Sequence, residues 1–326
     1  MHPDSKVASP RALILIPGSM NYFYNQSGRR IAEALGALGC GIELTTLDAC
    51  PAEGYDLCVL SNISEILHSG GDFEQRMARI IDIRARCRVM MSLGIDCVST
   101  EWYHRIRDYS ARAGADLIAD LGLFDQSPFL EPQHRARYRL VFSGLTPSEA
   151  RVLELLDEDD AGRTIPWAFV GSSTPHRVAL IDHLVQTVDP RGFVYMPPPS
   201  LCTEKGSPHL NQQQFERVLA RTRYQIWCSG HSYFYMETER FRTSLLTGGV
   251  PIKIIESRAE IPASVPLDYL MIERAEVAQR LASHTYARLL RRFRDDWRRF
   301  PMLHQELARV LGEFGIDAGN AASRAA

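Results

Sequence analysis

Side chains suited to anion binding and proton transfer are densest just after residue 228 of this 326-residue chain. A short apolar run over 224–228 predicts a strand, which ends at Ser229 and Gly230. The following loop and helix supply imidazole, carboxylate and guanidinium groups from His231, Glu237, Glu239 and Arg240. Because ligands of open α/β sheets bind at the carboxyl ends of strands, this stretch is the first candidate site.

A second set of candidate residues follows the strand predicted over 165–170. Gly171, Ser172 and Ser173 form a short turn of small residues, and a helix then opens at Thr174-Pro175. Backbone N–H groups of such a turn and of the helix N-terminus can cradle a phosphate, and Arg177 adds a charged donor. Alone this turn is a weak signal, but together the two sets predict one anion-binding pocket.

A residue that takes the proton of a hydroxyl group is predicted in two places. Asp96 follows the strand predicted over 88–93 and is the first candidate base, with a cap of a turn or helix as the alternative. His231 is the second candidate, as a base or a diphosphate ligand, and a loop histidine with ordinary hydrogen bonds is its alternative.

Alternating strand and helix patterns position these groups. In the first half, β-rich runs at 12–16, 42–47, 57–61 and 88–93 are separated by amphipathic segments such as 27–38 and 73–86. The same rhythm returns in the second half, with strands at 165–170, 192–196, 224–228 and 251–255. The fold class is therefore predicted to be α/β, with two doubly wound, Rossmann-like domains that carry helices on both sheet faces.

The length of the chain favours two domains rather than one. An acidic stretch over 154–160 leads into Ala161 and Gly162, and this change of pattern marks the predicted boundary. We expect an N-terminal domain over 1–160, a second domain over 161–285, and C-terminal helices over 286–326 that pack back on the first domain.

The segment after Arg240 resembles a motif of the GT-B glycosyltransferases, in which two Rossmann-like domains face a cleft. Arg240, Ser244-Leu245 and Gly248-Gly249-Val250-Pro251-Ile252 are similar to R-x-x-E-A-L-x-x-G-x-V-P-V, and the exostosin-like and CgeB-like groups look closest. In that family this helix lies beside the nucleotide and diphosphate of the sugar donor. The chain departs from the motif at Thr243, where the family has a glutamate that contacts the ribose or sugar.

The resemblance implies a glycosyltransferase that uses a nucleotide-diphosphate sugar as donor substrate and needs no further cofactor. Either Glu239 substitutes for the family glutamate, as part of the candidate catalytic set, or the donor contact differs. In the family the N-terminal domain recognises the acceptor, so Asn25, Gln26 and Ser27 are expected acceptor contacts, with Ser27 as a helix cap in the alternative. The predicted donor-binding residues are Gly171, Ser172, Ser173, Arg177, Ser229, Gly230, Arg240, Arg242, Thr243 and Ser244.

No catalytic metal is expected, because the only D-x-D spacing, Asp157 to Asp159, lies in the predicted linker. The leaving diphosphate is then neutralised by cations and helix N-termini, a role we assign to Arg177, Arg240 and Arg242, with a solvated surface charge as the alternative for Arg242. The pattern leaves open whether the reaction inverts or retains the configuration of the sugar.

Composition limits the class of protein and its partners. Hydrophobic residues make up 45% and charged residues 23%, as in an ordinary globular protein. The formal net charge of −2 disfavours nucleic acid as a partner. Seven widely spaced cysteines without a C-x-x-C pair indicate reduced, mostly buried thiols and a cytoplasmic protein. No apolar run is long enough for a signal peptide or a membrane span.

The segment 288–300 predicts a basic amphipathic helix, with Leu289, Leu290, Phe293 and Trp297 on one face. Either it docks on anionic lipid, which would suit a lipid-linked acceptor, or it is the C-terminal helix that in GT-B folds packs back on the N-terminal domain through its apolar face, with its arginines solvated. A glycan or a small molecule are the other acceptor classes. Two further functions stay open, namely a nucleotide-sugar epimerase or hydrolase of the same fold, and a non-catalytic carbohydrate-binding relative.

Overall fold

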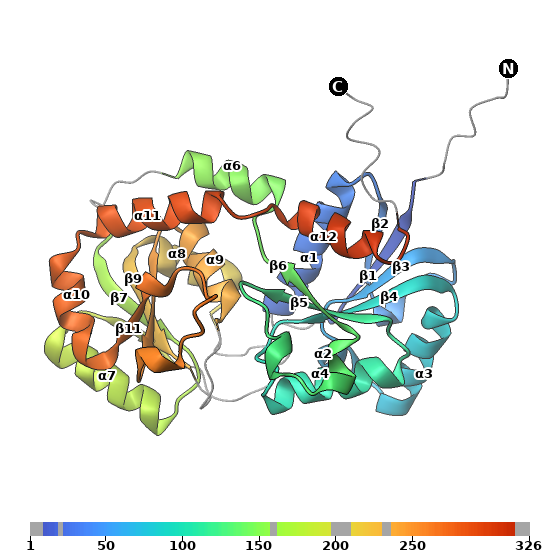
Figure 1. The fold of residues 1–326 in the computed structure, drawn as a ribbon, viewed down its shortest axis with the longest axis horizontal. Helices are drawn as coiled ribbons and strands as arrows, with labels where there is room; N and C mark the ends of the chain where they lie inside the picture. The colour runs from blue at the N-terminus through green and yellow to red at the C-terminus, as the bar shows by residue number, and fades with distance from the viewer. Residues whose placement is uncertain (1–8, 19–21, 157–161, 197–209, 230–235, 317–326) are drawn as a thin grey trace, which may run out of the picture. The chain divides into compact units, whose positions relative to one another are not determined.

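The computed structural model describes residues 9–18, 22–156, 162–196, 210–229 and 236–316. The chain divides into two compact units, each built on one sheet (Figure 1). The first unit comprises residues 1–121, 125–147 and 301–326, and the second comprises 122–124 and 148–300. The predicted class, two doubly wound α/β domains with C-terminal helices, is confirmed.

The boundaries of the two units differ from the domain boundaries predicted after residues 160 and 285. Helix α6 (Pro147–Leu155) belongs to the second unit from Ser148 onward, because Glu149 forms an ion pair with Arg242 of that unit. Helix α11 (Tyr286–Arg298) also lies in the second unit, and the chain returns to the first unit only from Pro301. The acidic stretch over 154–160 therefore begins in the last turn of α6 and does not mark the end of the first unit.

The first unit has a six-stranded sheet in the order β2-β1-β3-β4-β5-β6. Neighbouring strands from β2 to β5 run parallel. The strands are β1 (Arg11–Ile16), β2 (Gly41–Thr46), β3 (Tyr55–Leu60), β4 (Cys87–Gly94), β5 (Leu117–Gly122) and β6 (Tyr138–Phe142). The main helices of this unit are α1 (Tyr22–Ala37), α2 (Ile63–His68), α3 (Phe73–Arg84), α4 (Glu101–Arg112) and α12 (Leu303–Gly312).

The sequence of β1 explains why helices cover both faces of this sheet. Leu13, Ile14 and Leu15 are all fully buried, although successive side chains of a strand point to opposite faces. Ile14 packs in a cluster with α1 and α12 residues, whereas Leu13 and Leu15 pack in a second cluster with α2 and α3 residues. A strand buried on both faces reads as an unbroken apolar run, as β1 does.

Helix α1 begins at Tyr22, earlier than the predicted start at Ser27. Ser27 lies inside the helix and is fully buried, so the alternative in which it caps the helix is wrong. Arg30 of the same helix donates hydrogen bonds to Ser143 Oγ at 3.0 Å and to the carbonyl oxygen of Gly144 at 2.8 Å. These bonds fix α1 to the segment that follows β6.

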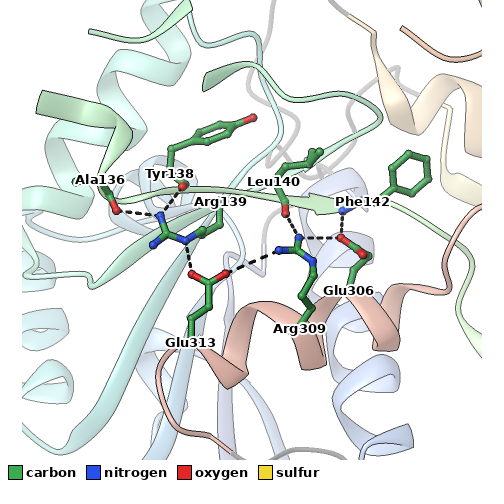
Figure 2. Close-up of polar contacts among 8 residues, drawn as sticks. All are labelled: Ala136, Tyr138, Arg139, Leu140, Phe142, Glu306, Arg309 and Glu313. Carbon is green, nitrogen blue, oxygen red and sulfur yellow. Dashed lines mark hydrogen bonds and ion pairs between the residues drawn. The ribbon is translucent and has the colours of Figure 1, made fainter. Parts of the chain in front are cut away.

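Helix α12 covers the edge strand β6 with polar side chains (Figure 2). Arg309 donates to the carbonyl oxygen of Leu140 at 2.8 Å, and Glu306 accepts from the backbone N–H of Phe142 at 3.3 Å. Glu313 pairs with Arg139 at 2.7 Å. These contacts satisfy backbone groups that an edge strand would otherwise offer to another chain.

The second unit has a five-stranded parallel sheet in the order β11-β10-β9-β7-β8. Its strands are β7 (Ile165–Val170), β8 (Phe193–Tyr195), β9 (Thr222–Cys228), β10 (Val250–Ile255) and β11 (Met271–Glu273). Besides α6 and α11, its helices are α7 (Pro175–Thr187), α8 (Gln212–Ala220), α9 (Thr238–Leu246) and α10 (Val277–Ser283). Both units therefore place their first strand between the second and the third.

The apolar stripe of α11 is part of the core of the second unit. Leu289, Leu290, Phe293 and Trp297 are all buried, and the helix packs against β10. Several arginines of this helix are exposed, and Arg292 stacks on the ring of Tyr269 at 3.6 Å. In the described part of the chain, no helix is both long and apolar enough to cross a lipid bilayer.

Candidate functional site

The candidate site lies at the carboxyl edge of the second sheet, where β7 and β9 lie side by side. The chain leaves β7 toward β8 on one side and reaches β9, β10 and β11 on the other. The strand order reverses between β7 and β9, and open α/β sheets bind ligands in the crevice at such a point. The two predicted sets of residues, after Val170 and after Cys228, thus follow neighbouring parallel strands.

Two arginines converge on Gly171 at the end of β7. A Cβ atom added to Gly171 would lie 3.4 Å from Arg177 Nη1 and 3.5 Å from Arg240 Nη2. Arg177 Nη1 donates to Ser172 Oγ at 2.6 Å and to the Ser172 carbonyl oxygen at 3.1 Å. Arg240 Nη1 donates to the carbonyl oxygen of Val170 at 2.6 Å. The turn after β7 is therefore flanked by two positive charges from different helices.

The N-terminus of α7 adds a third anion-attracting feature to this turn. Thr174 caps the helix, with its hydroxyl accepting from the backbone N–H of Arg177, and Pro175 occupies the first turn. Arg177 is buried, and its Nε atom has no hydrogen-bond partner within the described residues. A buried, unpartnered N–H beside a helix N-terminus is suited to an anionic ligand.

A buried ion pair that the sequence analysis did not predict supports the end of β9. Lys253 of β10 donates to Glu237 Oε2 at 2.7 Å, and the Trp227 indole N–H donates to the same oxygen at 3.1 Å. Ser229 Oγ donates to Glu237 Oε1 at 3.1 Å. Burial alone would raise the pKa of Glu237, but Lys253 and Arg240 lower it below its usual range. The only sequence signal was a lysine within the apolar run of β10.

Three predicted site residues on α9 have partners in the interior of the second unit. Arg242 bonds to Glu239 at 2.7 Å and to Glu149 of α6 at 2.8 Å, and only 1% of its side chain is exposed. Burial lowers the pKa of Arg242, and the two carboxylates more than offset this, so its pKa is raised. Ser244 donates a short hydrogen bond to Gln225 of β9. These side chains connect α9 to α6 and to the sheet.

The remaining predicted donor residues are exposed, half-buried or outside the described part of the chain. Ser173 is exposed beside Ser172, and Thr243 is half-buried on α9, one turn beyond Arg240. Gly230 and His231 lie outside the described residues, as do Asp157 and Asp159. Within the residues that the structure describes, no three His, Cys, Asp or Glu side chains are grouped so that they could hold a metal ion.

A further polar group, which the sequence analysis did not single out, lies at the ends of β10 and β11. Glu256 follows β10 and accepts from Arg274 Nη2 at 2.7 Å. His176, at the start of α7, lies 3.1 Å from the same Arg274 nitrogen and 3.5 Å from Glu256. The Glu256 side chain is 58% exposed, so an acceptor carboxylate at this sheet edge is open to ligands.

In the first unit, the candidate base Asp96 follows β4 and is half-buried. Burial raises its pKa to about 6. Thr100 rather than Asp96 caps the next helix, α4, because its hydroxyl accepts from the backbone N–H of Tyr103. The alternative in which Asp96 caps that helix is therefore wrong, whereas a role as a turn cap stays a prediction. The pKa of its carboxyl is close to the range in which a general base works.

The predicted acceptor contacts lie on the first turns of α1. Asn25 Oδ1 accepts from the backbone N–H of Gly18 at 3.2 Å, which ties the helix to the segment after β1. Asn25 and Gln26 are half-buried, whereas Ser27 is buried. Two of the three residues thus keep partly exposed side chains.

Comparison with known proteins identifies the fold by structural similarity. No protein-family model and no curated protein matches the sequence. An alpha-glucosyltransferase in complex with UDP is similar in structure, with 8% identity over 94% of this chain and 100% of that chain and a TM-score of 0.56. An alpha-glucosyltransferase with UDP and a 13-mer DNA containing a central A:G mismatch has 10% identity over 96% of this chain and 97% of that chain, with a TM-score of 0.52. At such identities the likeness shows the fold, which is that of GT-B glycosyltransferases.

Proposed function

We propose that the protein is a glycosyltransferase that moves a sugar from a nucleoside-diphosphate sugar to a hydroxyl acceptor. The observation that carries this proposal is the convergence of Arg177 and Arg240 on Gly171, at the switch point of the second sheet. The solved structures with this fold that hold UDP support it. Within the GT-B enzymes, the motif from Arg240 to Ile252 favours the exostosin-like and CgeB-like groups.

The proposed donor contacts are Gly171, Ser172, Ser173, Arg177, Ser229 and Arg240. Glu239, Arg242 and Ser244 are left out of this set, because their hydrogen bonds are internal to the second unit. The guanidinium groups of Arg177 and Arg240, together with the α7 N-terminus, supply positive charge where negative charge develops on the leaving diphosphate. Such preorganised charge can stabilise the transition state without a metal ion, which is the mechanism we propose.

Asp96 is the proposed base. Its carboxylate takes the proton of the acceptor hydroxyl as that oxygen bonds to the anomeric carbon and the bond to the diphosphate oxygen breaks. A carboxyl whose pKa is about 6 is ionised at neutral pH and still basic enough to accept this proton. This assignment favours an inverting reaction.

Glu256 is the proposed contact to the ribose of the donor. Thr243 cannot supply the carboxylate that the family motif has, and Glu239 is buried against Arg242. Glu256 lies two strands from β7, about 10 Å across the sheet at the usual strand spacing, and follows its strand at the same carboxyl edge as Gly171. Arg274 and His176 hold its side chain, so that its carboxylate can accept from two ribose hydroxyls.

The acceptor class follows from the charge of the protein. The net charge of −2 favours a glycan, a lipid-linked acceptor or a small molecule over nucleic acid. Exposed arginines on α11 support contact with an anionic membrane surface, while its apolar face is committed to the core. We propose a cytoplasmic enzyme that reaches the membrane peripherally.

The test is product analysis with a panel of nucleotide sugars, with and without a mixture of acceptors. A transferase releases the nucleoside diphosphate at a useful rate only when an acceptor is present, whereas an epimerase or hydrolase converts the donor alone. Asp96→Asn is expected to lower kcat at least about 100-fold, because general-base catalysis contributes about that much. A protein that binds a nucleotide sugar but converts none under any condition would be the non-catalytic carbohydrate-binding relative.

A further inference from the structure

Asp120 is a fully buried carboxyl near the end of β5, in the strand next to the one that leads to Asp96. Tyr138 of β6 donates its hydroxyl to Asp120 Oδ2 at 2.6 Å, and Gln126 Nε2 donates to the same oxygen at 2.9 Å. Asp120 Oδ1 has no hydrogen-bond partner in the described chain. One oxygen therefore accepts both hydrogen bonds, and the other accepts none.

Gln126 connects this carboxyl to the segment that carries the proposed base. Its Oε1 accepts from the backbone N–H of Val98 at 3.2 Å, and its own backbone N–H donates to the Tyr138 hydroxyl at 3.0 Å. Val98 lies only two residues beyond Asp96, in the stretch between β4 and α4. The chain of bonds from Asp120 through Gln126 to Val98 thus fixes the backbone beside Asp96.

The surroundings of Asp120 favour a neutral carboxylic acid. The titratable groups that act on it are Asp96 after β4, Asp125 after β5, Tyr103 of α4 and Tyr138 of β6. No Lys, Arg or His of the described residues forms an ion pair with Asp96 or Asp120, and Arg107 is a charged neighbour of Tyr103. Burial raises the pKa of Asp120 most, the bonds from Tyr138 and Gln126 lower it, and the charges of Asp96 and Asp125 raise it, so that the net pKa is about 7.

The bonding pattern agrees with that neutral state. In a protonated carboxyl, the carbonyl oxygen can accept two hydrogen bonds while the hydroxyl oxygen carries the proton. Asp120 Oδ2 accepts two hydrogen bonds, as a carbonyl oxygen can, and Oδ1 is the oxygen left to carry the proton. A buried and a half-buried carboxyl that are neighbours, with no ion-pair partner in the described residues, do not readily ionise together, so the more exposed Asp96 is the one that carries charge.

We propose that Asp120 is a positioning residue for Asp96, which holds the backbone beside the base through Gln126 and does so as a neutral acid at the pH at which Asp96 titrates. This proposal rests on the proposed function, since it takes Asp96 as the base. Asp120 itself need not touch the acceptor.

The first test compares Asp120→Ala with Asp120→Asn in the full-length protein, with the exposed Asp82→Asn as a control. Asp120→Ala removes the acceptor of both bonds and is expected to lower kcat about 100-fold, the effect of misplacing a catalytic group by about 1 Å, with the affinity for UDP or GDP unchanged. Asp120→Asn keeps an oxygen that accepts both bonds, so it is expected to restore most of the lost kcat. Equal loss in both variants, or full activity of Asp120→Ala, would overturn the proposal.

The pH dependence of kcat/KM separates positioning from a charge effect. The acid limb reports Asp96 and is expected near pH 6 in the wild type. It is expected at the same pH in Asp120→Asn, because one neutral group replaces another. If Asp120 were ionised, its removal would take a negative charge away from Asp96 and move this limb down by about 1 pH unit. Such a shift would contradict the neutral acid.

The thermal stability gives a readout that does not depend on turnover. The pKa of Asp120 is raised from 3.8 to about 7, so its stabilising effect is complete below the lower value and is lost as pH rises through the upper one. As the pH rises from about 4 to about 8, the Tm of the wild type is therefore expected to fall further than the Tm of Asp120→Asn. Parallel curves of Tm against pH for the two proteins would contradict a neutral Asp120, even if no nucleotide sugar were turned over. Failure of turnover alone would count against the proposed function.

Discussion

Arg240 and Arg242 are two residues apart in the sequence, yet their environments differ in kind. Arg240 is half-buried beside Gly171, with its guanidinium 5.6 Å from the Trp227 ring, whereas Arg242 lies between two carboxylates in the interior. Their opposite positions on α9 follow from the helical repeat, because residues two apart do not share a face. From the sequence, both residues were predicted to neutralise the leaving diphosphate.

Arg242→Ala is expected to destabilise the protein by about 3 to 5 kcal/mol, because it leaves the buried Glu239 and Glu149 carboxylates without their cation. Urea unfolding measures this change. Arg191→Ala, which removes an exposed ion pair with Asp189, is the matched control and should cost less than about 1 kcal/mol. A stable Arg242→Ala protein that no longer binds UDP would show that Arg242 belongs to the donor site after all.

The ribose contact assigned to Glu256 predicts a specific loss of discrimination. Wild-type protein is expected to bind UDP more tightly than 2′-deoxy-UDP. Glu256→Gln is expected to reduce the ratio of the two Kd values about 5-fold, since replacing a hydrogen bond to a charged group by one to a neutral group costs about 1 kcal/mol. The ratio cancels the effect of removing a negative charge near the diphosphate. Glu276→Gln, which alters an exposed i,i+4 pair with Arg280, is the control.

No difference between the two nucleotides in the wild type, or an unchanged ratio in Glu256→Gln, would exclude this role for Glu256. Calorimetric titration measures both Kd values directly. A change in affinity of equal size for both nucleotides would reflect charge alone.

At the scale of elements, α12 connects the end of the chain to the first unit. Its residues Leu303, Leu307, Val310 and Leu311 are fully buried in the same cluster as Ile14 of β1. Leu307→Ala is expected to destabilise that unit by about 2 to 5 kcal/mol through the lost contacts and the cavity. Leu155→Ala, at a position 86% exposed, should change stability little. Calorimetric unfolding checks this, and equal transition temperatures for both variants would show that α12 does not stabilise the first unit.

The sequence predicted the elements whose apolar pattern is long and uninterrupted. Strands β1, β4, β7 and β10 and helix α3 lie close to their predicted ranges, and α7 begins where a helix was predicted to open. Burial on both faces makes such strands continuous apolar runs. The short strand β11 was missed, since three residues, Met271–Glu273, do not establish a period. The start of α1 was placed too late, because Ser27 resembled a cap although it is buried inside the helix.

At the scale of the whole molecule, the sequence predicted the fold class but not the order of the strands in each sheet. The alternation of strands and helices predicted two parallel sheets, but which strands are neighbours depends on contacts between distant segments. The same limit applies to the site. Gly171, Arg177 and Arg240 were predicted because they follow strands, whereas the pairing of Lys253 with Glu237 joins residues of two elements and left no periodic signal.

The measurement that tests the central claim most directly is a calorimetric titration of UDP and GDP into the wild type and into an Arg177→Ala/Arg240→Ala double variant. At least one of the two nucleotides is expected to bind the wild type, and the matching nucleoside without phosphates is expected to bind far more weakly. The double variant should lose about 3 kcal/mol or more of binding free energy, at about 1.5 kcal/mol or more for each charged donor, which is at least about 100-fold in Kd. Failure of both nucleotides to bind the wild type, or equal affinities in the double variant, would contradict a diphosphate site at the carboxyl ends of β7 and β9.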